Sequence, residues 1–175
     1  MDKRRIYIVL TDTGTILNRI IKFYTNKPYN HVSISLDREL DELYSFARKK
    51  YYNPLIGGFV KEDRNNNPIL MKSKCVIYCL ETDVETYNRV LNNIKEFYNN
   101  KDKFKYNILG LIGVIIKKEF KRKNKYFCSQ FVATVLKDSG IELISKKPCF
   151  TMPFDFAELD SLSFIYEGLL SKYRV

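Results

Sequence analysis

One of the four cysteines in this chain, Cys128, stands where a thiol could act as a nucleophile. It opens the segment CSQFVATVLKDSG, whose apolar residues recur at helical spacing, and the basic run KKEFKRKNK ends shortly before it. The unpaired amides of a helix N-terminus and nearby cations both favour a thiolate over a thiol. Cys128 is therefore a candidate nucleophile, and a small buried residue on a helix is the alternative interpretation.

A cysteine nucleophile needs a proton acceptor within hydrogen-bonding distance, and the chain contains a single histidine, His31. His31 begins the alternating run HVSISLD at 31–37, which is typical of a strand. In an extended strand it shares the less apolar face with Ser33 and Ser35. A lone histidine is most often a surface or core residue, so the pairing of His31 with Cys128 is a hypothesis about their distance in space.

The other three cysteines carry weaker signals. Cys75 and Cys79 have C-x3-C spacing, but the chain offers no convincing further zinc ligands, so we expect core thiols. Cys149 follows a Lys-Lys-Pro stretch, which is typical of a loop. Because we find no glycine-rich phosphate loop, pair of catalytic carboxylates or histidine-rich motif, we expect neither a cofactor nor a metal.

The opening residues and the apolar stretches bear on localisation. Only five apolar residues follow MDKRR before Thr11, fewer than a signal peptide contains. The longest apolar stretch, ILGLIGVII at 108–116, is about half as long as a bilayer crossing requires. We therefore expect a cytoplasmic protein with free thiols and no transmembrane segment.

The chain is strongly basic, with 30 Lys and Arg against 20 Asp and Glu and a net charge of +10. Such an excess attracts anionic surfaces without identifying one. The densest basic run lacks the interleaved aromatics of a nucleic-acid platform, so we expect no specific nucleic acid. An anionic surface could be bound through Lys117, Lys118, Lys121, Arg122, Lys123 and Lys125.

Length and composition predict one α+β domain over residues 1–175, with 45% hydrophobic residues to form a core. Alternating or β-rich runs predict strands at 4–11, 31–37, 42–49, 59–63, 69–81 and 162–170. Pro54 and Gly57-Gly58 predict an irregular segment at 51–58. Helices are predicted over 12–25, from a Thr82–Glu85 capping box to about Tyr98, over 105–120, from Cys128 to Gly140, and from 151–153 onward.

Two segments, TNKPYNHVSISLD and YFCSQFVATVLKDSGI, together resemble the circularly permuted branch of the NlpC/P60 papain-like superfamily. This branch includes the YiiX-like and the lecithin:retinol acyltransferase-like proteins, in which the His strand precedes the Cys helix. The stretch Tyr106–Gly110 is similar to the family's aromatic-x-x-Leu-Gly segment, and TMPFDF is similar to its closing Thr/Ser-Pro element. The resemblance covers residues 5 to 160.

The resemblance implies a fold and a site. The fold would be a small antiparallel, partly barrel-like sheet packed against helices that include the Cys helix. Cys128 would be the nucleophile, with its own amide as an oxyanion donor, and His31 the general base. A third residue on the strand after the His strand orients the imidazole in the family. Ser45 occupies the in-register position, and Glu42 is the alternative if the register slips.

The expected function is that of a cysteine-dependent hydrolase or acyltransferase. It would act on an amide or ester bond of a small-molecule, peptide or lipid-like acyl substrate, through an acyl-enzyme on Cys128. The alternative is a non-catalytic binding module that uses its basic face to hold an anionic lipid, peptide or nucleic acid. Ionic strength distinguishes the two, because charge-driven binding weakens steeply with salt.

Overall fold

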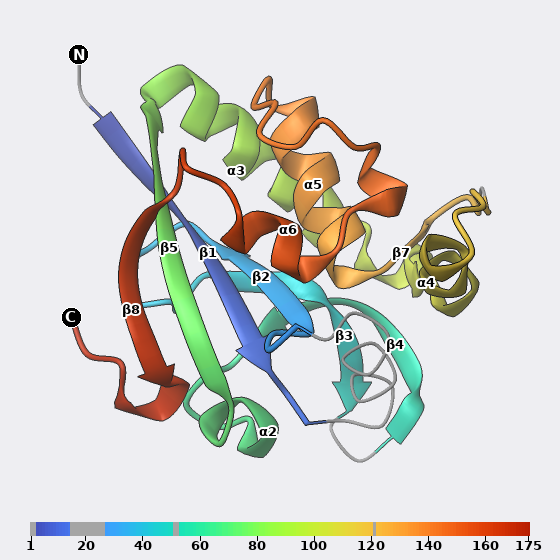
Figure 1. The fold of residues 1–175 in the computed structure, drawn as a ribbon, viewed down its shortest axis with the longest axis horizontal. Coiled ribbons are helices and arrows are strands. Elements are labelled where there is room, and N and C mark those ends of the chain that lie inside the picture. The colour runs from blue at the N-terminus through green and yellow to red at the C-terminus, as the bar shows by residue number, and fades with distance from the viewer. Residues whose placement is uncertain (1–2, 15–26, 51–52, 121) are drawn as a thin grey trace.

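A six-stranded antiparallel sheet forms the centre of the fold (Figure 1). The computed structural model describes residues 3–14, 27–50, 53–120 and 122–175. The strands are β1 Lys3–Asp12, β2 His31–Ser35, β3 Leu43–Lys50, β4 Asn53–Glu62, β5 Lys74–Asp83 and β8 Ser163–Leu169. Their order is β4-β3-β2-β1-β5-β8, so within the described residues the sheet is open, with edges at β4 and β8.

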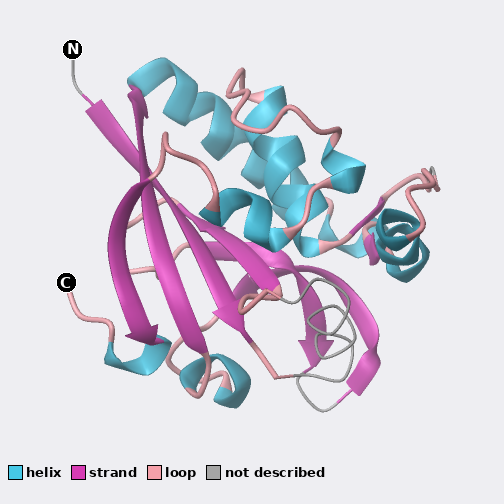
Figure 2. Cartoon of the chain, in the orientation of Figure 1, coloured by secondary structure: helices cyan, strands magenta, loops and turns pink. Residues whose placement is uncertain are grey.

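Helices gather mainly on one face of this sheet, and a short parallel pair of strands lies outside it (Figure 2). The α-helices are α2 Pro68–Met71, α3 Val84–Asn99, α4 Ile108–Ile115, α5 Cys128–Asp138 and α6 Pro153–Ala157. The parallel pair is β6 Lys105–Tyr106 and β7 Lys125–Tyr126. Single 3-10 turns occur at Lys101–Lys103, Pro148–Phe150 and Leu170–Lys172. None of the helices in the described ranges is both long and apolar enough to cross a membrane.

The main core lies between the sheet and the helices α3 and α5. The inward residues of β1 and β2, such as Ile8 and Ile34, pack with Phe131 and Val132 of α5. Phe46 of β3 is fully buried and makes ring contacts with several aromatic residues of this core. The opposite face of the sheet carries a second, smaller core that includes both Cys75 and Cys79. These packed faces hold α5 over the central strands.

Several sequence predictions are confirmed. The fold is α+β, the run at 42–49 is an antiparallel partner of the His31 strand, and the run at 162–170 forms β8. The Cys128 helix extends over the predicted residues, and Gly140 follows it in the left-handed conformation, with φ of 84°. The partly barrel-like closure is not seen, because the two edge strands of the described sheet do not pair.

The prediction of an irregular segment at 51–58 is wrong for residues 53–58, which belong to β4. Pro54 is tolerated because it lies at a register shift in the pairing of the edge strand β4 with β3, where no ladder pair includes it. The two glycines are needed for close approach. A Cβ on Gly57 would lie 2.9 Å from the Cβ of Tyr106, and one on Gly58 would lie 2.8 Å from the carbonyl of Phe104.

Three predicted boundaries also shift. Residues 68–71 form α2, because Asn67 caps the backbone amides that follow and Pro68 occupies the first turn, so the strand at 69–81 starts later as β5. The cap of α3 is Asp83, whose carboxylate accepts from the Thr86 amide, in place of the Thr82–Glu85 box. The helix at 105–120 is only α4. The helix predicted at 12–25 falls largely on residues 15–26, outside the described residues.

The aromatic core supports a first prediction. Phe46→Ala removes a fully buried ring and leaves a cavity, so the free energy of unfolding should fall by about 3–5 kcal/mol in urea titrations. Phe164→Ala is the matched control, because Phe164 is 61% exposed and should cost less than about 1 kcal/mol. Equal losses in the two variants would contradict this description of the core.

Candidate active site

His31 is held at the first position of β2 by the residue before it. Asn30 is buried, its backbone amide donates to the Thr11 carbonyl, and its side-chain oxygen accepts from the amide of Thr13 at 3.2 Å. Its side-chain nitrogen donates to Asp12 at 2.8 Å. These bonds tie Asn30 to the end of β1, so they fix the backbone that leads into His31.

Cys128 is the first residue of α5 and is buried, with 4% of its surface exposed. α5 packs against β2 and β3, and this packing brings its first turn to the end of β2 where His31 lies. The Cys128 thiol lies close enough to the His31 imidazole to help raise the pKa of that ring. Phe127, the N-cap residue of α5, makes no side-chain hydrogen bond to the first amides of the helix, and these amides point toward the end that carries the thiol. The two residues that the sequence pairs are therefore neighbours in space.

The third member of the cluster is Glu62, at the end of β4. Its Oε1 lies 2.9 Å from Nε2 of His31, and both side chains are buried, at 9% and 4% exposure. Because Nε2 is engaged by the carboxylate, Nδ1 is the ring nitrogen available to the sulfur of Cys128. The result is a chain of contacts that runs from thiol to imidazole to carboxylate.

Two serines complete the hydrogen bonds of this carboxylate. Ser33 donates to Oε2 of Glu62 at 2.5 Å, and Ser45 donates to Oε1 at 2.9 Å. Each hydroxyl oxygen also lies 3.3 Å from Nε2 of His31. Both serines are buried, and they share one face of adjacent strands with His31. The buried charge of Glu62 is thus surrounded by three donors, which lowers the cost of its burial.

The electrostatics of the cluster favour an ionised pair. Burial alone would lower the pKa of His31, but the charge of Glu62, the neighbouring Cys128 and the hydrogen bond to Glu62 outweigh this effect, and the pKa lies well above the ordinary 6.5. Burial alone would raise the pKa of Glu62, whereas the charge of His31 and the three hydrogen bonds lower it. An imidazolium facing a carboxylate is therefore the favoured state at neutral pH.

Among the two residues predicted to orient His31, the structure places Ser45 in the cluster and Glu42 outside it. Glu42 hydrogen-bonds to Lys61 and to Tyr44. Ser45 touches the imidazole but also donates to the residue that carries the charge, Glu62, which the sequence analysis missed. Glu62 lies one strand beyond the strand next to β2, and its diagonal reach to His31 depends on the registers of two strand pairs.

Tyr106 forms part of the wall beside the thiol. Its side chain rests on Gly57, where no Cβ intervenes, and this contact links β6 to the middle of β4. Burial, with a contribution from nearby Cys128, raises the pKa of the Tyr106 phenol well above its ordinary value. Tyr106 therefore presents a neutral hydroxyl group near the cluster at physiological pH.

The segment TMPFDF is anchored to the same helix. The buried hydroxyl of Ser129 donates to the carbonyl of Thr151 at 2.6 Å, next in the chain to Cys128. The Asp155 carboxylate accepts from the amide of Met152 at 2.8 Å and so starts α6. These contacts fix the first turn of α5, and with it the orientation of the thiol.

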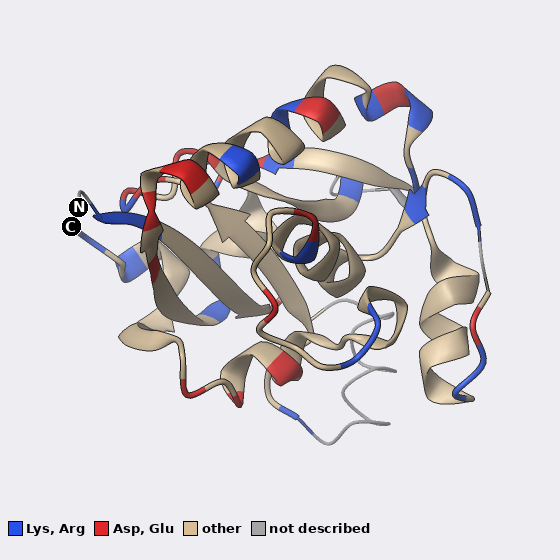
Figure 3. Ribbon diagram, turned by 90° about the horizontal axis from the view of Figure 1, so that it is seen from above, with Lys and Arg blue, Asp and Glu red and all other residues tan. Residues whose placement is uncertain are grey.

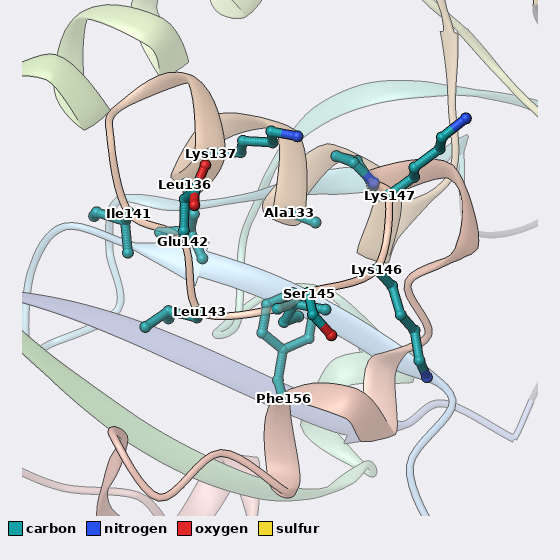
Figure 4. Close-up of a pocket in the computed structure, with 12 residues that line it drawn as sticks. Ala133, Leu136, Lys137, Ile141, Glu142, Leu143, Ser145, Lys146, Lys147 and Phe156 are labelled. Carbon is teal, nitrogen blue, oxygen red and sulfur yellow. The ribbon is translucent and has the colours of Figure 1, made fainter.

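A pocket of about 440 Å³ lies elsewhere on α5 (Figure 4). Figure 4 shows residues of α5, such as Ala133 and Lys137, on one side of it and Phe156 of α6 on another. Neither Cys128 nor His31 lines this pocket. It is a feature separate from the cluster.

Those of the basic residues named from the sequence that the structure describes lie around α4 and β7, at one side of the molecule (Figure 3). Lys117, Lys118, Arg122 and Lys123 are exposed and Lys125 is half-buried, while Lys121 falls outside the described residues. These residues form no part of the Cys128 cluster.

Searches against family models and against curated proteins return no match to this chain.

The buried pair predicts how stability depends on pH. The folded pKa of His31 is raised, so its contribution is complete below about pH 6.5 and is lost as the pH rises through the folded value. Between about pH 6.5 and pH 9, the free energy of unfolding should fall by at least about 1 kcal/mol. Glu62→Gln removes the charge that raises this pKa, so its decline should be smaller and should occur at lower pH.

Urea titrations at a series of pH values measure this dependence. Glu158→Gln is the control, because Glu158 is exposed and pairs with Lys27 on the surface, so its profile should run parallel to that of the wild type. Parallel profiles for all three proteins would show that the His31–Glu62 pair is not ionised in the folded state.

Proposed function

We propose that the protein is a cysteine-dependent hydrolase or acyltransferase that acts on an amide or ester bond. The observation that carries this proposal is the buried chain of contacts from Cys128 through His31 to Glu62. A thiol at a helix start, an imidazole beside it and a carboxylate behind the imidazole are the parts that nucleophilic catalysis by cysteine requires.

The proposed fold is the permuted papain-like fold of NlpC/P60 proteins, of the YiiX-like or lecithin:retinol acyltransferase-like kind. The order His strand, then Cys helix supports it, as does the antiparallel sheet against which the Cys helix packs. Glu62 supplies an orienting side chain of a type that this family uses, at a position that is one strand further than the sequence indicates.

The proposed reaction begins with the Cys128 thiol proton already on His31, so that a thiolate faces an imidazolium. The sulfur attacks the carbonyl carbon of the substrate, and the resulting oxyanion accepts a hydrogen bond from the amide of Cys128 at the start of α5. Collapse expels the amine or alcohol, which takes the proton from the imidazolium, and leaves a thioester on Cys128. Water or another nucleophile, deprotonated by His31, then resolves the thioester to an acid or to a new ester or amide.

The carboxylate of Glu62 has a defined part in this scheme. It holds the ring through Nε2, which directs Nδ1 to the sulfur, and its charge stabilises the imidazolium that forms in both half-reactions. Ser33 and Ser45 keep the carboxylate in place and contribute no charge. The compartment we propose is a reducing one, the cytoplasm, which suits the four free cysteines.

Alkylation by iodoacetamide, resolved for each cysteine by mass spectrometry, tests the proposed dyad. At about pH 6.5 Cys128 should react faster than Cys149, although Cys149 is the more exposed of the two. Burial raises the pKa of Cys149, and that of Cys75 to about 12, so these thiols serve as internal references. His31→Gln should slow Cys128 by about a hundredfold or more and leave Cys149 unchanged.

Two further variants separate the roles behind the imidazole. Glu62→Gln should slow alkylation of Cys128 by about tenfold, because the imidazolium loses its counter-charge, whereas Ser45→Ala should retain most of the rate. A thioester on Cys128 after incubation with activated acyl esters, absent in Cys128→Ser, would extend the result to acyl transfer. Equal alkylation of Cys128 and Cys149 in the wild type would refute the enzyme proposal and favour the binding module.

A further inference from the structure

The helix α4 exposes three of its six aliphatic side chains. Ile108, Leu109 and Ile112 are 45%, 47% and 45% exposed, and Ile116, which caps the helix, is 56% exposed. Only Gly110, Leu111 and Gly113 of this helix are buried. An exposed aliphatic surface of this kind on a basic protein marks a site of interaction with a partner.

The exposed residues form one continuous stripe. At about 100° per residue, Ile108, Ile112 and Ile116 stack at i, i+4 and i+8, and Leu109 lies beside them, within an arc of about 100°. The opposite side of α4 is attached to the molecule through Leu111, which packs with Phe127, the residue before Cys128. The helix therefore presents its apolar stripe outward on a fixed base.

A basic segment runs back along the same helix. Lys117 adopts a left-handed conformation with φ of 53° and reverses the chain, and the amide of Lys118 donates to the carbonyl of Gly113 at 2.8 Å. The segment approaches so closely that a Cβ on Gly113 would lie 2.4 Å from the Lys118 carbonyl and 2.8 Å from the ring of Phe120. The chain then returns to β7 beside β6, at the opposite end of α4.

This arrangement places cations beside the apolar stripe. Gly113 follows Leu109 by four residues, so the returning segment lies along the edge of the stripe. It carries Lys117, Lys118, Arg122 and Lys123, all exposed, while its acidic residue, Glu119, is paired with Lys147 at 3.2 Å. Phe120, 37% exposed, adds an aromatic ring to the same edge. Figure 3 shows these basic positions at the foot of the helix and along the outer segment.

We propose that α4, with residues 116–120, 122 and 123, forms a docking surface for an anionic lipid bilayer. The helix would lie in the plane of the membrane interface, with Ile108, Ile112 and Ile116 among the acyl chains and the basic residues at the lipid phosphates. A helix of eight residues is too short to span a bilayer, but an exposed aliphatic face bordered by Lys and Arg is the pattern of an interfacial helix.

The composition of the surface favours lipid over other anionic partners. A nucleic acid would call for aromatic platforms on which bases stack, whereas the stripe is built from isoleucine and leucine. A bilayer satisfies both parts of the surface, since acyl chains cover the aliphatic side chains and phosphates neutralise the cations. The proposal does not depend on catalysis by Cys128, and the residues that test it are outside the His31 cluster.

A tryptophan introduced into the stripe gives a direct readout, because the chain contains no Trp. In Ile112→Trp the emission should shift to shorter wavelength when phosphatidylcholine vesicles that contain phosphatidylglycerol are added, as the indole leaves water. Vesicles of phosphatidylcholine alone should give a much smaller shift. Phe164→Trp, on exposed β8, is the matched control and should show no shift with either vesicle.

Co-sedimentation with the same vesicles tests the contributions of the two parts. The double variant Ile112→Gln and Ile116→Gln should bind anionic vesicles at least about tenfold more weakly, at unchanged charge. Replacing Lys118 and Lys123 by Gln should also weaken binding, whereas Lys172→Gln, an exposed lysine at the other end of the chain, should not. Alkylation of Cys128 in these variants reports on the catalytic proposal separately.

Three results would overturn the proposal. One is the absence of binding to anionic vesicles, and another is binding that the isoleucine substitutions leave unchanged, which would reduce it to charge adsorption. The third is a doubled molar mass in light scattering without lipid that the Ile112→Gln and Ile116→Gln variant abolishes, since a second copy of the chain would then cover α4.

Discussion

A carboxylate buried in a protein must be neutralised and fully hydrogen-bonded, and this constraint on Glu62 organises the candidate site. His31 supplies the opposite charge, and Ser33 and Ser45 supply the remaining donors. The three donors come from β2 and β3, the carboxylate comes from β4, and the imidazole must also reach α5. The registers of three strands and the position of one helix are therefore coupled through a single ionised side chain.

The rest of the fold supplies the rigidity that such a coupling needs. The aromatic core around Phe46 presses α5 onto β2 and β3, so the first turn of the helix cannot slide away from His31. The missing side chain of Gly57 lets Tyr106 approach β4, and this joins the edge strand that carries Glu62 to the segment that leads into α4. The thiol, the imidazole and the carboxylate are thus held by elements that pack on one another.

Local signals in the sequence predict much of this arrangement, and the errors arise where distant elements decide. Cys128 at a helix start and His31 on an alternating strand are visible because each signal lies within a few residues. Glu62 is invisible by the same reasoning, since its role depends on pairing across β2, β3 and β4. From the sequence, Gly57 is typical of a turn, because its actual role, to let Tyr106 approach β4, depends on a contact between distant segments. The exposed stripe of α4 is likewise not predictable, because the sequence shows that residues 108–116 are apolar but does not show that other elements leave one side of them uncovered.

The protonation state of His31 decides whether the buried His31–Glu62 pair exists, and nuclear magnetic resonance can follow the single histidine of the chain. The ring nitrogen and carbon shifts should report an imidazolium at about pH 7.5 and a midpoint well above 6.5, and Glu62→Gln should lower that midpoint. A neutral ring at that pH, with a midpoint near 6.5 that Glu62→Gln leaves unchanged, would contradict the account, because the buried pair would then not exist.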